Sequence, residues 1–466
     1  MQANVVVIAA YGIGCFLAGS VLFKKAAGTL GMRRPNIITL VYYVFIVQFL
    51  LAAFLETSGS AKGYFSMRAV FDDSVVKAFY ATYGVFVLLP LFVILLQRVL
   101  HIHPKKEGDA LFKRPWKTVT DRSDSIIILG LFIGGAVVSI IFLGLMLFTD
   151  MPLKNALKAN VTGTELAIAR HQWVWGEEKW VQYVRNIVGG WLTPLMALIS
   201  FVYWLMHRSF ARLALFLWLS VVACLFLLSS LAKGPILFYF LLPIAYVYGL
   251  FCGGFRGKQL GLLSLAVIAA AVVLYSVTLR TPDLKAIIPA LLERVFFGQY
   301  SGTVLTFDMF PRLNPFLGLS GFFVQGPWRL LGGEGTRYSV LLMQQYYPEG
   351  WAAERAGYMS TLFIAEGYAC FGIIGILLSV FIVALWLTVL QWLWFRVRLQ
   401  PVSVAFLGLL TFWLISFVGD GLLVFLYPSG VLIVALTVYL LILCARGKPV
   451  FRLVRYNSCK KRNAIL

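Results

Sequence analysis

Eleven apolar stretches, each long enough to cross a membrane, constrain this chain more than any other feature of its sequence. They fall at about residues 3–23, 36–55, 79–100, 125–148, 186–206, 213–230, 235–253, 260–278, 361–394, 403–419 and 430–445. A hydrocarbon core of about 30 Å needs roughly 20 apolar residues in a helix, and no water is available there for unpaired backbone groups. With 61% hydrophobic and 13% charged residues, the sequence predicts an all-α polytopic membrane protein of about 11 transmembrane helices.

The positive charges are distributed unevenly between alternate loops. One set of loops lies at about 24–35, 98–124, 207–212, 254–259, 396–402 and 446–466. This set holds 24 of the 40 Lys and Arg residues, although the opposite set is longer. The positive-inside rule places it in the cytoplasm, so we expect the N-terminus to face outward and the C-terminus inward. We expect these basic loops to contact anionic lipid headgroups rather than nucleic acid.

The spans divide the chain into four parts. Residues 1–278 hold the first eight helices, 279–358 form one large outward loop, 359–445 hold the last three helices, and 446–466 form a basic tail. In the large loop, Asp283 and apolar residues at helical spacing from Leu284 to Phe296 predict an amphipathic helix on the membrane surface.

Cations of the outward side are the first candidates for function. Lys233 lies in the tight turn "SSLAKGPIL", where a contact to an anion and a lysine that reaches toward headgroups are both reasonable interpretations. Arg280, Arg294 and Arg337 lie in the large loop. Guanidinium groups stay charged and bind phosphate with two parallel hydrogen bonds, so these arginines predict a phosphate-bearing ligand.

The outward loop 149–185 adds further candidates. Arg170 and His171 lie there, and His171 is the sole histidine on the outward side. Thr164 is a candidate helix cap. Three tryptophans are interpreted as interface anchors, with stacking against sugar rings as the alternative: Trp173, Trp175 and Trp180.

Glu366 stands at the head of the ninth span, in "LFIAEGYACFGIIG". An ionisable group there is a functional candidate, and a structural ion pair with Lys233 or an arginine is the alternative. Ala365, Ala369 and Gly372 are spaced four and three apart and predict one small-residue helix face. Asp420 is interpreted as a turn residue of the last outward hairpin.

Several catalytic motifs are absent from the outward loops. These loops contain no DxD-like carboxylate pair, no HExxH, no Walker loop and no GxSxG. Such motifs hold metals, bind nucleotides or supply a serine nucleophile. We therefore expect neither a metal nor a cofactor.

The chain resembles the bacterial oligosaccharide repeat-unit polymerases, the O-antigen polymerase (Wzy) family. The resemblance rests on the multi-span frame with one major outward loop before the antepenultimate span, on "SSLAKGPIL", and on "LFIAEGYACFGIIG", which is similar to the family's acidic residue followed by an aromatic and "FG..G". The family often has arginine where this chain has Lys233. Related O-antigen ligases place a histidine in the large loop, and residues 279–358 contain none, which favours a polymerase.

The resemblance implies a metal-independent, type C-like glycosyltransferase of the bacterial inner membrane. Such an enzyme joins oligosaccharide repeats linked to undecaprenyl pyrophosphate into a surface polysaccharide on the periplasmic face. Its partners are lipid-linked donor and acceptor oligosaccharides, membrane lipids and, as an optional partner, a chain-length regulator protein. On this hypothesis Glu366 or His171 acts on the acceptor hydroxyl, and five cations bind the pyrophosphate: Arg280, Arg294, Lys233, Arg170 and Arg337.

Two alternatives stay open. One is a glycosyltransferase that resembles the O-antigen ligases, on the same frame. The other is a non-enzymatic flippase or transporter of an anionic lipid-linked substrate, which predicts ionisable residues deep in several spans.

Overall fold

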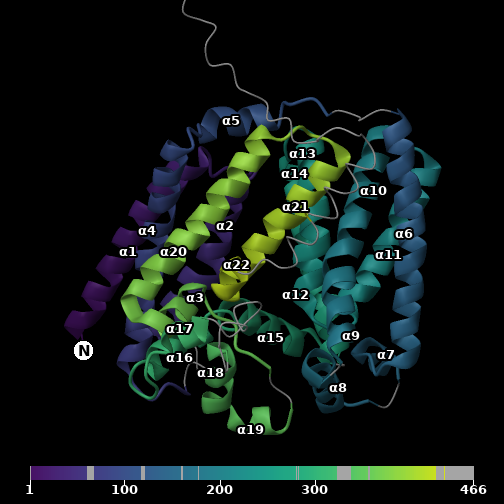
Figure 1. Ribbon diagram of the computed structural model, residues 1–466. Helices are drawn as coiled ribbons and strands as arrows, with labels where there is room; N and C mark the ends of the chain where they lie inside the picture. Colours follow the sequence, from purple (N-terminus) through teal and green to yellow (C-terminus); the bar gives the residue numbers. More distant parts are fainter. Residues whose placement is uncertain are drawn as a thin grey trace, which may run out of the picture.

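The chain folds into a bundle of helices (Figure 1). The computed structural model describes residues 2–59, 68–116, 121–158, 161–176, 178–279, 281, 283–322, 337–354, 357–426 and 435. Every regular element in these ranges is helical, and ten helices there are long and apolar enough to cross a membrane. The predicted all-α polytopic membrane protein is confirmed. The eleventh expected stretch, 430–445, lies outside the described residues apart from residue 435.

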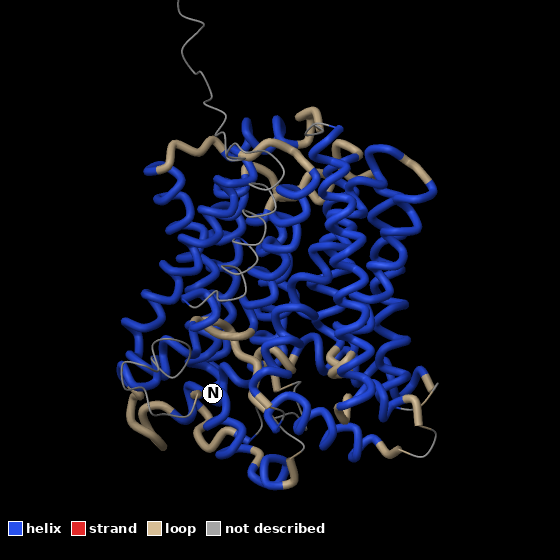
Figure 2. The backbone as a smooth tube through the Cα atoms, turned by 45° about the vertical axis from the view of Figure 1, so that its right-hand side comes forward, coloured by secondary structure: helices blue, strands red, loops and turns tan. Residues whose placement is uncertain are grey.

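The ten spans agree with the expected apolar stretches. Three of them contain π-helical segments, η1, η4 and η5, within the span. In chain order they are α1 (Gln2–Ala27), α2–η1–α3 (Ile37–Thr57), α4 (Asp73–Val99), α6 (Asp121–Phe148), α9–η4–α10 (Lys179–His207), α11 (Phe210–Leu228), α12–η5–α13 (Lys233–Phe251), α14 (Gly257–Leu279), α20 (Ile364–Arg396) and α21–η7 (Pro401–Gly419). Figure 2 shows these helices side by side, with the loops gathered at the two ends.

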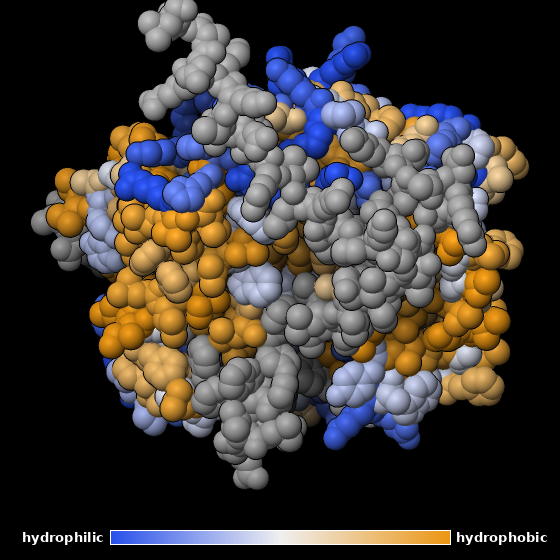
Figure 3. Space-filling model, turned by 45° about the horizontal axis from the view of Figure 1, so that its top comes forward, coloured by the Kyte–Doolittle hydropathy of each residue, from blue (hydrophilic) through white to orange (hydrophobic). Residues whose placement is uncertain are grey.

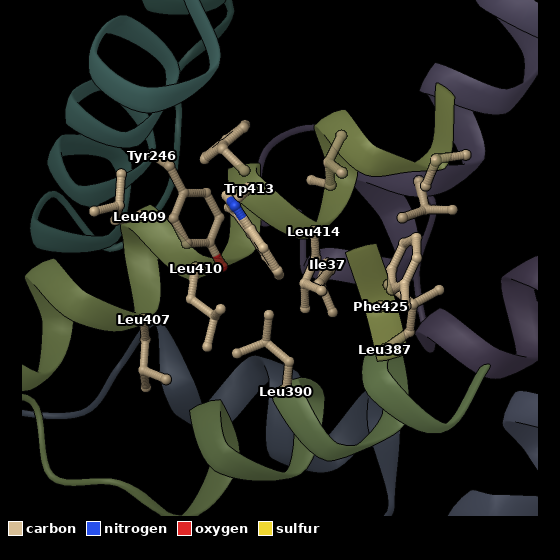
Figure 4. Packing of buried hydrophobic residues seen from close by; sticks show 14 of the residues in the cluster. Ile37, Tyr246, Leu387, Leu390, Leu407, Leu409, Leu410, Trp413, Leu414 and Phe425 are labelled. Atoms are coloured by element: carbon tan, nitrogen blue, oxygen red, sulfur yellow. The ribbon is translucent and has the colours of Figure 1, made fainter. Parts of the chain in front are cut away.

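Helix α21 lies at the centre of the bundle. Of its most apolar stretch, 89% is buried, whereas the corresponding stretch of α14 is entirely unburied. A helix that is apolar all round is buried when neighbours surround it, and α21 packs against α10, α13 and α20. Figure 4 shows Trp413 and Leu410 of α21 beside Tyr246 of α13 and Leu390 of α20. Helix α14 therefore offers its surface to lipid.

Helix α20 is interrupted near its start. Phe371 and Gly372 leave the helical conformation, and Gly372 has φ of 61°, a value that favours glycine. A Cβ atom on Gly375 would overlap the carbonyl oxygen of Gly367, so the segment before the break packs tightly on the segment after it. The predicted continuous small-residue face is wrong, because Gly372 forms the break.

The short helices gather at the end of the bundle opposite α5 (Pro104–Leu111) (Figure 1). This end is called the site end, and the end with α5 is called the basic end. The site end holds α7 (Pro152–Ala156), α8 (Gly163–His171), α15 (Leu284–Phe296), α16 (Ser301–Met309), α17 (Gly318–Phe322), α18 (Tyr338–Tyr346) and α19 (Pro348–Ala352). Helix α22 (Leu423–Leu426) lies further into the bundle, against α20 (Figure 1).

The helix starts at the site end follow from local capping. The predicted helix 284–296 is confirmed as α15, and the Asp283 carboxylate accepts a hydrogen bond from the Lys285 backbone N–H at 2.9 Å. Thr162 caps α8 and forms a capping box with Glu165, the pattern in which hydroxyl and carboxylate satisfy each other's backbone donors. The prediction that Thr164 caps this helix is therefore wrong.

Asp308 fixes the large loop to the bundle. Its side chain is fully buried and accepts hydrogen bonds from the backbone N–H groups of Val70 and Phe71 and from the hydroxyls of Ser74 and Tyr346. A buried carboxylate is tolerated when donors satisfy it in this way. Asp308 thus joins α16 to the start of α4 and to α18, the helix that Arg337 precedes.

Candidate functional site

The site is built around a buried carboxylate. Glu366 lies in the first turn of α20 and is only 1% exposed. Its Oε2 accepts a hydrogen bond from the Leu423 backbone N–H at 2.7 Å, and its Oε1 lies 3.9 Å from Arg337 Nε. The alternative interpretation of Glu366, an ion pair with an arginine, therefore has its partner in Arg337.

Arg337 joins this carboxylate to the turn after η7. Its side chain is 12% exposed, and its Nη2 donates a hydrogen bond to the Asp420 carbonyl oxygen at 3.1 Å. The turn passes close by because it contains glycine: Gly421 has φ of 131°, and a Cβ there would lie 2.9 Å from Glu366 Oε2. The start of α18, the start of α20 and the turn at 420–423 are thus held together by one ion pair and two hydrogen bonds.

Tyr358 and Asp420 form the next part of the site. The Tyr358 hydroxyl donates a hydrogen bond to the Asp420 carboxylate, and the guanidinium of Arg337 lies 5.3 Å from the centre of the tyrosine ring. The charge of Asp420, together with burial, raises the pKa of Tyr358 to about 12. Burial raises the pKa of Asp420, although Arg337, Tyr358 and Arg294 oppose this shift.

Arg170 and Arg294 complete the cluster from the other side. Arg170 lies in the last turn of α8 and Arg294 in the last turn of α15. Burial lowers the pKa of Arg170, and the charge of Arg294 lowers it further. Both residues are nevertheless exposed to solvent. In the part of the chain that the structure describes, neither forms an ion pair within 4 Å.

The structure brings four of the predicted site residues together and does not describe the side chains of two others. Glu366, Arg337, Arg170 and Arg294 lie within electrostatic range of one cluster. Lys233 begins α12, but its side chain is outside the described part of the chain, as is Arg280 altogether.

His171 is adjacent to Arg170 at the end of α8. Its ring lies edge-on to Trp351, with centroids 5.9 Å apart, and its Nδ1 is buried with no hydrogen-bond partner among the described residues. Of the three tryptophans, Trp173 is 1% exposed and Trp180 is 56% exposed, while the side chain of Trp175 is not described. Trp173 is therefore a core residue, and the prediction that it is an interface anchor or a sugar platform is wrong.

Two functional candidates were missed from the sequence. Asp420 does lie in a turn, as expected, but it also belongs to the charged cluster. Tyr358 stands in the chain just before α20 and carries no motif. For Asp420 the signal in the sequence was indirect. Asp420 and Glu366 are acids at span ends on the side that the charge distribution predicts to face outward, and Arg170, Arg294 and Arg337 are cations of the same side.

The cluster has the composition of an anion site with a carboxylate beside it. Arg170 and Arg294 are exposed cations, Arg337 is fixed by Glu366, and the carboxylate of Asp420 lies among them. Among the described residues no group of three or more His, Cys, Asp or Glu side chains is arranged to hold a metal ion.

No family model matches the chain, and no curated protein or solved structure matches it either.

Proposed function

We propose that this protein is a glycosyltransferase that joins oligosaccharide repeats linked to a polyprenyl pyrophosphate, so that they form a surface polysaccharide. The observation that carries the proposal is the convergence of Arg170 and Arg294. The charge of Arg294 acts on Arg170, and like charges repel each other. An anion with two phosphates bound by both guanidinium groups would relieve that repulsion through bidentate hydrogen bonds. This support comes from the residues themselves and from the resemblance in "SSLAKGPIL" and "LFIAEGYACFGIIG".

The reaction needs a stabilised leaving group. A hydroxyl oxygen of the acceptor sugar attacks the anomeric carbon of the donor, and the bond from that carbon to the pyrophosphate oxygen breaks. The pyrophosphate leaves with the electron pair. Arg170 and Arg294 meet the negative charge that develops on it, because fixed donors aimed at developing charge lower a barrier.

The proton of the acceptor hydroxyl goes to Asp420. We assign the base to Asp420 because its side chain is partly exposed and burial raises its pKa, which makes its carboxylate a better proton acceptor. Tyr358 orients that carboxylate. Glu366 is a positioning residue in this scheme, since its oxygens are buried and face Leu423 and Arg337.

The site end faces the periplasm in this proposal, and the membrane is the bacterial inner membrane. The basis is the charge asymmetry of the loops: the set expected in the cytoplasm, whose described parts lie at the basic end, holds 24 of the 40 Lys and Arg residues of the sequence. Lipid-linked donor and acceptor reach the charged cluster from the outer leaflet. A chain-length regulator protein is a further partner in the proposal.

The decisive experiment measures which lipid-linked product accumulates in cells. Cells with the gene deleted should accumulate single repeats on the lipid carrier and make no long polymer. Arg170→Gln/Arg294→Gln should reproduce this defect at normal protein level. Lys154→Gln/Lys158→Gln should not, although it also removes two positive charges, from the loop that holds Arg170. Normal polymer in the deleted cells would overturn the proposal.

The same experiment separates the alternatives. A ligase defect leaves long polymer stranded on its carrier, and a flippase defect leaves single repeats facing the cytoplasm. The flippase alternative predicts ionisable residues deep in several spans, whereas the Asp, Glu, Lys and Arg residues of the ten described spans lie near the span ends. This distribution supports the enzyme over the flippase.

A further inference from the structure

A cavity of about 660 Å³ lies at the basic end, away from the candidate site. Three segments that are distant in the sequence line it: the connection from α1 to α2, the start of α5, and the connection from α13 to α14. Figure 1 shows α5 at the top of the bundle, and Figure 3, with this end turned forward, shows hydrophilic surface gathered along that edge. The cavity is independent of the proposed function.

The lining of this cavity is strongly basic. Arg33, Arg34, Lys105 and Arg256 line it together with a single carboxylate, Asp109. That carboxylate lies 3.7 Å from Arg34 Nη1, and Arg34 Nε also donates a hydrogen bond to the Gly253 carbonyl oxygen at 3.2 Å. The other three cations are exposed and form no ion pair within the described part of the chain.

The backbone around the cavity is fixed rather than loose. The Phe255 N–H donates a hydrogen bond to the Arg33 carbonyl oxygen at 2.7 Å, which joins two loops more than 200 residues apart. Gly254 has φ of 132°, and a Cβ there would lie 2.9 Å from the same carbonyl oxygen. Gly28, with φ of 77°, packs directly against the backbone of Lys105. Within the described part of the chain, these contacts hold three cations without an ion-pair partner around the cavity, although like charges repel one another.

The position of the cavity indicates what fills it. Two of its lining segments connect the ends of α1 and α2 and of α13 and α14, and span ends lie at the depth of phospholipid headgroups. The apolar stretches of α1 and α14 are only 11% and 0% buried, so acyl chains have exposed helix surface beside the cavity. Basic pockets between span ends bind anionic headgroups in this way.

We propose that this cavity binds the phosphate of an anionic phospholipid headgroup, with Arg33, Lys105 and Arg256 as its ligands. A phosphodiester brings the missing negative charge to the three cations. Its acyl chains lie along α14 and α1. A soluble phosphate ion shares the headgroup chemistry, and the experiment below separates these two sources.

The test uses the full chain purified in a neutral detergent. Native mass spectrometry counts retained lipid after titration with phosphatidylglycerol, with phosphatidylcholine or with inorganic phosphate, and thermal unfolding is followed in parallel. Lys105→Gln/Arg256→Gln removes two exposed ligands. Lys24→Gln/Lys258→Gln is the matched control, because it removes the same charge from exposed residues of the same end that do not line the cavity. Cys252→Trp fills the cavity without changing its charge.

We expect one phosphatidylglycerol to be retained and to raise the unfolding temperature, with little effect of phosphatidylcholine. The ligand variant should bind phosphatidylglycerol roughly thirtyfold more weakly, because each of the two removed cations contributes roughly a fivefold gain in affinity for an anionic headgroup. Cys252→Trp should also lose the lipid, and the control should keep it. Retention of the lipid by both cavity variants would overturn the proposal. A stabilisation by inorganic phosphate that equals that by phosphatidylglycerol would overturn the lipid assignment.

Discussion

Replacement of Arg337 by methionine tests whether the Glu366–Arg337 pair holds the site together. Methionine keeps an apolar stem beside Tyr358 but leaves Glu366, 1% exposed, without its cation. Loss of one partner of a buried pair costs about 3–5 kcal/mol. The 3.9 Å separation and the remaining hydrogen bond from Leu423 place this pair at the lower limit, so we expect a cost of about 3 kcal/mol.

Cys370 provides a local assay for this cost. It is 2% exposed and lies in the same short helical segment as Glu366. In a chain whose other five cysteines are replaced by serine, maleimide labels Cys370 only when the segment opens. If the segment closes faster than maleimide reacts, a loss of about 3 kcal/mol in the stability of its closed form should make labelling of Cys370 over a hundredfold faster.

Lys77→Met is the matched control. Its ion pair with Asp73 is shorter, at 2.7 Å, but both side chains are about half exposed, and such surface pairs contribute about 0–1 kcal/mol. The double variant Glu366→Gln/Arg337→Met should be less damaging than the sum of its single changes, with a coupling of about 1–2 kcal/mol. Labelling in Arg337→Met as slow as in Lys77→Met, or additive effects, would refute the reasoning.

Three further changes test the rest of the site. Gly421→Ala places a Cβ 2.9 Å from Glu366 Oε2 at a φ of 131°. It should destabilise the site by about 1–3 kcal/mol and so make labelling of Cys370 faster. Unchanged labelling would contradict the tight turn. Tyr358→Phe removes a hydrogen bond that stabilises ionised Asp420. The pKa of Asp420 should rise further, so the acidic limb of the pH–rate profile should move to higher pH; a limb that stays in place would exclude Tyr358 as its orienting residue. Asp420→Asn should abolish polymer formation with Cys370 still protected, as checked by chain-length analysis and labelling together.

Much of the fold follows from the sequence because the membrane imposes it. An apolar stretch of about 20 residues has one low-energy structure in lipid. For this reason the bounds of α11 and α21 are close to those expected. The helix 284–296 was also predictable, since its cap at Asp283 and its apolar spacing are both local signals.

The details that shape the site depend on contacts between distant residues. Nothing local in "CFGIIG" separates a glycine within a helix from one at a break, and only the approach of Gly375 to Gly367 shows why Gly372 interrupts α20. Sequence alone suggested an arginine partner for Glu366 but did not single out Arg337. Asp420 and Tyr358 are 62 residues apart, and their hydrogen bond has no trace in spacing.

The most direct test of the proposed function is a reaction of the purified protein in proteoliposomes that contain polyprenyl-pyrophosphate-linked repeats. The measurement is the length of the lipid-linked product together with the polyprenyl pyrophosphate that is released. The account predicts chains of several repeats and one molecule of polyprenyl pyrophosphate released for each new linkage. Arg170→Gln/Arg294→Gln should lose both. Movement of intact single repeats across the bilayer, with no release of pyrophosphate, would contradict it.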